Sequence, residues 1–141
     1  MLAINSRGIV AHALKEGAYN GNLFMDFINN NLTAHFHSNP RDILVMDNCA
    51  FYHRCDVISL LNDLQIAHAF LPPYSPSLNP IEEYFSHLKS RYSSISPRPR
   101  NREDIMRRVT DILNLENIYF EGWFRLMRIW VDRGIARHEF T

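Results

Sequence analysis

A block of prolines between two secondary-structure elements constrains this chain more than any other feature. Residues 71–83 read L-P-P-Y-S-P-S-L-N-P-I-E-E. Proline lacks the backbone N–H and restricts the residue before it, so neither a helix nor a central strand can continue through Pro72-Pro73. Asn79-Pro80 then favours a helix start, with asparagine at the N-cap and proline at the first helical position. We therefore predict a stiff, extended crossing that joins a strand to a helix.

The residues before this crossing predict a βαβ unit. Residues 43–46 are a continuous apolar run of strand length, I-L-V-M, as expected for a strand buried on both faces. Apolar residues recur at helical spacing from 53 to 64, and residues 65–71 form a second candidate strand. Strands joined in this way are parallel and adjacent. Asp47-Asn48 would then lie at the carboxyl end of the first strand, where open α/β sheets present their sites.

The remaining elements flank this unit. Residues 2–4 and 8–12 read as two short strands joined by a turn. A single helix with one buried stripe is predicted around residues 23–32. After the helix that begins at Pro80, residues 91–102 read as a basic loop, and two further helices follow. The first runs to about residue 115 with Ile105 among its inward residues, and the aromatic residues of the second are predicted to cover the core.

Two acidic positions have both a structural and a functional interpretation. An aspartate that follows a strand, such as Asp47, can simply cap a turn. Asn79-x-x-Glu82 has the spacing of a capping box, and the helix dipole favours a carboxylate in the first turn, together worth about 0.5–2 kcal/mol. Taken one at a time, both residues leave these alternatives open.

The two motifs together resemble the catalytic domain of DDE transposases of the mariner-like superfamily. The relevant residues are D-N-C-A-F-Y-H at 47–53 and the proline block that ends in N-P-I-E-E. In that family the second catalytic aspartate lies in a D-N-x-x-x-H-type motif, and the third acid is the glutamate of N-P-I-E. The resemblance assigns these roles to Asp47 and Glu82, which 34 residues separate, a spacing typical of these enzymes. Asn48 and His53 become supporting residues, and Glu83 is the second choice for the third acid.

The resemblance implies an α/β fold of the ribonuclease H-like type, with a mixed sheet flanked by helices. It also implies carboxylates around two Mg²⁺ or Mn²⁺ ions, which prefer oxygen ligands and clamp the attacking and leaving oxygens at phosphorus. The expected reaction is cleavage and strand transfer of DNA, with transposon ends and target DNA as partners and a homodimer as a possible assembly. His53 is expected to orient a site carboxylate or to contact the substrate.

The chain departs from the family at its start. The family's first catalytic aspartate lies on the first, central strand, upstream of the predicted hairpin, and neither Asp26 nor Asp42 matches its position. We therefore expect an N-terminally truncated domain without that strand: residues 1–92 as a partial catalytic core, and residues 93–141 as a basic loop with helices packed on it. Such a chain would hold metal poorly and be inactive alone. The alternative is a non-catalytic transposon remnant that binds nucleic acid or dimerises.

Charge is distributed unevenly although the formal net charge is zero. Up to Leu88 there are four basic and eight acidic residues, and from Lys89 onward eleven basic and seven acidic residues. A basic second half suits contact with DNA phosphates, although a solvated linker is the favoured interpretation of the basic loop itself. The candidate DNA-binding residues are Lys89, Arg91, Arg98, Arg100 and Arg102.

Composition indicates the compartment. Two cysteines supply neither a zinc pattern nor a disulfide framework, which predicts reduced thiols in an intracellular protein. No apolar run approaches the roughly 20 residues that span a membrane, and no signal sequence is evident. We expect a soluble protein, nuclear if the source is eukaryotic.

Overall fold

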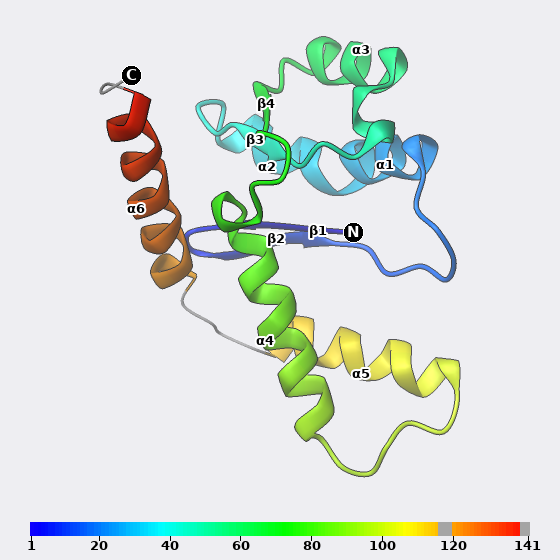
Figure 1. Ribbon diagram of the computed structural model, residues 1–141. Coiled ribbons are helices and arrows are strands. Elements are labelled where there is room, and N and C mark those ends of the chain that lie inside the picture. Colours follow the sequence, from blue (N-terminus) through cyan, green and yellow to red (C-terminus); the bar gives the residue numbers. More distant parts are fainter. Residues whose placement is uncertain (116–119, 139–141) are drawn as a thin grey trace. The chain divides into compact units, whose positions relative to one another are not determined.

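The computed structural model describes residues 1–115 and 120–138, which pack as two compact units (Figure 1). The first unit holds Met1–Ala3 and Val10–Ser75, and the second holds Ile4–Ile9 and the residues from Pro76 onward. Each unit is described by itself below. The predicted boundary at residue 92 stays a prediction, and residues 116–119 and 139–141 of its second part lie outside the described residues.

The predicted N-terminal hairpin is confirmed. Strands β1 (Leu2–Asn5) and β2 (Gly8–His12) form a two-stranded sheet. In the turn, the side-chain oxygen of Asn5 accepts hydrogen bonds from the backbone N–H groups of Arg7 at 2.9 Å and Gly8 at 3.1 Å. Gly8 has a φ of 151°, a backbone conformation that residues with a side chain rarely adopt. Asparagine and glycine therefore fix this two-residue connection.

The predicted helix that follows is present, and it contains a π-helical stretch that the sequence did not predict. Helix α1 (Gly21–Phe27) begins at Asn20, whose side chain accepts from the N–H of Leu23 at 3.0 Å. A π-helical stretch, η1 (Ile28–Leu32), leads into α2 (Thr33–Ser38). The carbonyl of Ile28 accepts from both the backbone N–H and the hydroxyl of Thr33, five residues later. This wider turn keeps the side chains of Ile28 and Leu32 buried.

The predicted βαβ unit is also confirmed. Strand β3 (Leu44–Met46) pairs in parallel with β4 (His68–Phe70), so that Val45 lies opposite Ala69. Between them lie a 3-10 turn, η2 (Ala50–His53), and helix α3 (Cys55–Asp63). The prediction of burial on both faces is wrong for this chain: Met46 is buried, but Val45 is 54% exposed. Successive side chains point to opposite faces of a strand, and the described residues cover only one face here.

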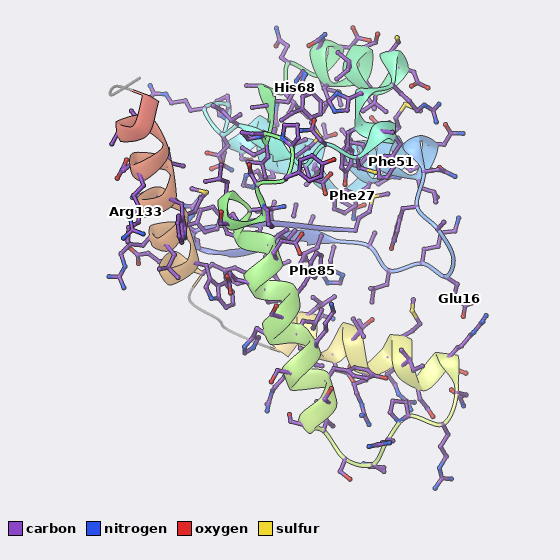
Figure 2. All side chains as sticks on the ribbon, in the orientation of Figure 1. Glu16, Phe27, Phe51, His68, Phe85 and Arg133 are labelled. Carbon is purple, nitrogen blue, oxygen red and sulfur yellow. The ribbon has the colours of Figure 1, made fainter. Side chains whose placement is uncertain are left out.

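A single apolar cluster forms the core of the first unit. Phe27 from α1 belongs to it, and Phe51 from η2 packs against it (Figure 2). The buried members of the cluster are Phe24, Phe27, Ile28, Leu32, Met46, Val57, Leu61 and Ile66. Helices α1 and α3 and strand β3 therefore share one core, and this core fixes the position at which β3 ends.

The second unit is helical apart from the tip of the hairpin. It contains η3 (Pro76–Leu78), α4 (Pro80–Ser94), α5 (Arg102–Leu115) and α6 (Glu121–His138). The proline crossing ends in η3, and α4 starts at the predicted Pro80. Tyr84 on α4 is fully buried against the rings of Phe120 and Trp123, with centroid distances of 5.1 and 6.0 Å.

Two predictions about the later helices are corrected. Ile105 on α5 was expected to face inward but is 41% exposed, while Ile112 and Leu113 on the same helix are buried. On α6, Trp123 is half-buried, whereas Trp130 is 47% exposed, so the aromatic residues of this helix only partly cover the core. Within the described residues, no helix is both long and apolar enough to cross a membrane.

Candidate functional site

Asp47 follows the last residue of β3 and is exposed at the carboxyl end of the strand. One of its carboxylate oxygens, Oδ1, accepts a hydrogen bond from the backbone N–H of Cys49 at 2.9 Å. The turn-capping role considered from the sequence is therefore real. An ionised carboxylate has about four lone-pair positions, so this single bond leaves Oδ2 available. Capping the turn fixes the carboxylate in place and is compatible with binding a cation.

Asn48 connects the ends of the two parallel strands. Its side-chain N–H₂ group donates to the carbonyl of Leu71, directly after β4, at 2.5 Å. Its side-chain oxygen lies 2.9 Å from Nε2 of His53. Because the amide oxygen can only accept, His53 must carry a proton on Nε2 in this arrangement. The turn after β3 is thus tied to the start of the proline crossing.

His53 forms a hydrogen bond with Asn48, and its expected role of orienting a site carboxylate or contacting the substrate stays a prediction. Its ring stacks on the ring of Phe70, with centroids 4.1 Å apart and planes inclined by 27°. The stacking contact and the hydrogen bond to Asn48 together fix the plane of the imidazole. His53 therefore acts on the turn that bears Asp47 through the neighbouring amide.

The pKa of Tyr52 depends on burial and on the charge of Asp47. Burial raises the pKa of its hydroxyl to about 12, and the negative charges of Asp47 and Cys49 add to the effect in the same direction. Its ring also packs against Phe24, with centroids 4.6 Å apart. The phenol stays protonated at neutral pH and anchors this turn to the core of the first unit.

Glu82 lies in the first turn of α4, where its carboxylate is exposed. The capping box that the sequence suggested is not formed, because the backbone N–H of Asn79 donates to the carbonyl of Pro76 at 3.0 Å. The side chain of Asn79 accepts from Ile81 N–H at a long 3.4 Å. Among the described residues, the carboxylate of Glu82 has no hydrogen-bond or ion-pair partner. The structural explanation for this glutamate is thereby weakened.

The predicted acidic residues belong to different units. The first unit brings Asp47, Asn48 and His53 together, whereas Glu82 and Glu83 lie in the second. Asp26 lies on α1. Oδ2 of Asp42 lies at hydrogen-bond distance, 2.9 Å, from Nε2 of His35, so Asp42 has a structural partner. In the described part of the chain, no group of three or more histidine, cysteine, aspartate or glutamate side chains could hold a metal ion.

Three of the five predicted basic residues line a cavity of about 570 Å³ in the second unit. These are Arg91, Arg98 and Arg100, and they are joined by Arg107 and Arg108 of α5. Lys89 and Arg102 do not belong to its lining. Arg107 and Arg108 were not among the predicted DNA-binding residues, because they lie beyond the basic loop, on the helix that follows it. The sequence did contain a clue to them: Arg107 and Arg108 are adjacent, and they follow Arg98, Arg100 and Arg102 by only a few residues.

Comparisons with known proteins agree with the motifs. A model of the family described as DDE superfamily endonuclease matches residues 1–106. No curated protein matches the chain.

Solved structures show the fold. The catalytic domain of Mos1 mariner transposase superposes with a TM-score of 0.70 at 15% identity, over 90% of this chain and 65% of that chain. A Mos1 catalytic domain with raltegravir and Mn gives a TM-score of 0.72 at 17% identity, covering 90% of this chain and 66% of that chain. The Mos1 paired-end complex with the left transposon end gives 0.67 at 19% identity, covering 90% and 38%. The predicted ribonuclease H-like α/β fold is confirmed, and the chain spans about two thirds of the length of the Mos1 catalytic domain.

Proposed function

Because this chain belongs to the DDE superfamily endonucleases, we propose that it is a portion of a transposase catalytic domain in which Asp47 and Glu82 bind divalent metal. The proposed activity of the whole domain is cleavage and strand transfer of DNA, with transposon ends and target DNA as substrates. The observation that carries the proposal is the state of the two carboxylates: Asp47 is fixed by a turn through one oxygen only, and Glu82 is not used by a capping box.

The donor set fits Mg²⁺ or Mn²⁺. Both ions prefer carboxylate oxygens and water, and exposed carboxylates at the end of a strand and in the first turn of a helix can offer them. When bound, a pair of such ions stabilises the attacking and leaving oxygens of an in-line displacement at phosphorus. The protein's own contribution is orientation: the N–H of Cys49 holds the Asp47 carboxylate, and Asn48 with His53 holds its turn.

We infer that this chain alone binds metal weakly and does not cut DNA. The family uses three carboxylates, and the candidate residues here supply two. Each missing carboxylate removes a negatively charged ligand, which lowers affinity and leaves the ions poorly placed. The alternative function is a non-catalytic module that binds nucleic acid or forms a homodimer, and it needs neither Asp47 nor Glu82.

The compartment follows from the same proposal. An enzyme that acts on chromosomal DNA works inside the cell, and in a eukaryotic cell it works in the nucleus. Cys49 and Cys55 are free and exposed thiols, which suits a reducing environment.

Mn²⁺ titration of the full chain tests the metal site. We expect Asp47→Asn and Glu82→Gln each to weaken Mn²⁺ binding by about tenfold or more, because each removes a charged ligand while nearly keeping the side-chain volume. Glu83→Gln should have a smaller effect, and Asp26→Asn on α1 is the control that should have none. Binding is measured by isothermal calorimetry or by the electron spin resonance of free Mn²⁺. If all four variants bind Mn²⁺ like the unmodified chain, the proposed site does not exist.

A further inference from the structure

The cavity in the second unit lies among the end of α4, the loop from 95 to 100 and residues 104–112 of α5. Figure 1 shows how this loop leaves α4 and returns to the start of α5. Five arginines line the cavity: Arg91, Arg98, Arg100, Arg107 and Arg108. Two aspartates, Asp104 and Asp111, are the acidic residues of the lining, so its formal charge is positive by three.

The backbone of this loop is held from both sides. The guanidinium of Arg108 donates to the carbonyl of Ile95 at 2.9 Å and to the carbonyl of Pro97, and it lies over the ring of Tyr92 with its carbon 5.5 Å from the centroid. At the other end, the N–H of Arg100 donates to the carboxylate of Asp104 at 3.3 Å. The loop therefore has a defined path, and its arginines project from a fixed backbone.

Four of the five arginines divide into two groups. Arg108 holds the loop, and Arg107 donates to Asp104 at 2.6 Å. Arg98 and Arg100 are exposed, and the structure gives their guanidinium groups no hydrogen bond to any described residue. Guanidinium forms two parallel hydrogen bonds with a phosphate and is weakly hydrated, which makes it the preferred side chain for binding phosphate groups. A positively charged cavity, with two guanidinium groups that form no hydrogen bond to a described residue, thus favours an anion that has several oxygen atoms.

We propose that this cavity binds backbone phosphates of DNA, with Arg98 and Arg100 as the principal contacts and Arg107 and Arg108 shaping the site. The choice of DNA as the source of the phosphate rests on the proposed function. The interaction is independent of base sequence, because phosphate contacts fix position and do not read bases.

Binding of a fluorescent DNA duplex of arbitrary sequence, measured by anisotropy in EDTA over a series of salt concentrations, tests the proposal. We expect the double variant Arg98→Gln/Arg100→Gln to weaken binding at low salt by about tenfold or more. It should also reduce the slope of log affinity against log salt by about 1 to 2, since each phosphate contact releases about one counterion. The double variant Arg125→Gln/Arg128→Gln on α6 is the control. It removes the same charge from exposed positions of the same unit, outside the cavity.

A second variant separates the proposal from loss of folding. Asp111 lines the cavity and is exposed, so Asp111→Asn removes a negative charge that repels phosphate. We expect tighter DNA binding by a factor of a few, a gain that misfolding cannot produce. Equal salt slopes for the two double variants, or no change in Asp111→Asn, would overturn the proposal.

The DNA-binding experiment and the Mn²⁺ titration test the cavity and the metal site separately. The cavity variants should keep the Mn²⁺ affinity of the unmodified chain. Loss of Mn²⁺ binding in Asp47→Asn with unchanged DNA binding in the cavity variants rejects the cavity and leaves the proposed function standing. The reverse pattern rejects the metal site and retains the cavity. An unmodified chain that binds no DNA overturns the cavity proposal, and the Mn²⁺ titration still judges the metal site by itself.

Discussion

At the scale of single residues, Asn48 has the most specific environment near the candidate site. It donates to the carbonyl of Leu71 and accepts from Nε2 of His53, so both ends of its amide are used. Rotation of the amide by half a turn would face its N–H₂ group toward the histidine N–H and its oxygen toward a carbonyl. The oxygen would then repel the carbonyl of Leu71 whichever ring nitrogen of His53 carries the proton. One orientation of Asn48 is therefore preferred, and the turn that bears Asp47 is held with it.

Removal of the imidazole should loosen this arrangement. We expect His53→Ala to weaken Mn²⁺ binding by up to about tenfold, in the lower part of the range for groups that orient metal ligands. His53→Gln can still donate a hydrogen bond to Asn48 and should recover part of the loss. His37 on α2 is also exposed, so His37→Ala is the matched control. A merely structural role for His53 predicts loss of thermal stability in His53→Ala with unchanged Mn²⁺ affinity, which would contradict the orienting role.

Tyr52 should give the chain a dependence on alkaline pH. Its pKa rises from 10.0 to about 12 in the folded chain, mainly through burial, so the folded state favours the protonated phenol. This contribution to stability is complete below pH 10 and is lost as the pH rises towards about 12. Denaturant unfolding at pH 9 and pH 11 should show a loss at the higher pH that Tyr52→Phe reduces. An equal loss in Tyr52→Phe would assign the effect to other groups.

The sequence predicted the identity of these residues better than their contacts. Asp47 and Glu82 stand out because a motif and its spacing mark them. The bond from Asn48 to Leu71 joins residues 23 positions apart, and it exists only because β3 and β4 end side by side. The positions of Arg107 and Arg108 around the cavity likewise depend on the path of the loop. Local patterns contain no information about such contacts, which arise from tertiary structure.

At the scale of elements, strong local signals gave correct predictions. Asn5 and Gly8 fixed the hairpin, and Asn79-Pro80 fixed the start of α4. The helix after Asn20 is also present, but the sequence did not predict the π-helical stretch inside it. The apolar residues of this helix recur at ordinary α-helical spacing. That spacing does not reveal one wider, π-helical turn within the helix. Ile28 and Leu32, at the two ends of the π-helical stretch, are both buried in the core of the first unit.

Helix α3 owes its place to a few buried residues. Val57 and Leu61 are completely buried in the core of the first unit, which also contains Met46 at the end of β3. We expect Leu61→Ala to lower the free energy of unfolding by about 2–5 kcal/mol, through lost transfer energy and the cavity it leaves. Ser59→Ala on the exposed side of the same helix should change it by less than about 0.5 kcal/mol. Urea unfolding of both variants measures the difference, and similar values for the two would contradict the assigned core.

At the scale of the whole molecule, the chain belongs to the family but corresponds to only part of the length of a solved catalytic domain. The family model matches residues 1–106, and the chain spans 65% of the Mos1 catalytic domain. The described residues form two sheets, β1–β2 and β3–β4, and each sheet contains only two strands. The apolar side chains of Val45 on β3 and of Ile43, just before the strand, are 54% and 59% exposed. Apolar surface and free backbone groups at such an edge favour pairing with a further strand.

Catalysis by this chain alone is the decisive question at this scale. We expect no Mg²⁺-dependent nicking of supercoiled DNA, because two carboxylates in place of three leave the metal ions with too few charged ligands to be held in position. Mn²⁺ binding should nevertheless be detectable and should depend on Asp47. The measurement is conversion of supercoiled plasmid to the open circle over time, with Asp47→Ala prepared in parallel to expose contaminating nuclease. Residual nicking that Asp47→Ala retains is contamination and leaves the expectation intact. Robust nicking that Asp47→Ala abolishes would show that the residues present here already form a working site, and the inference of inactivity would then be wrong.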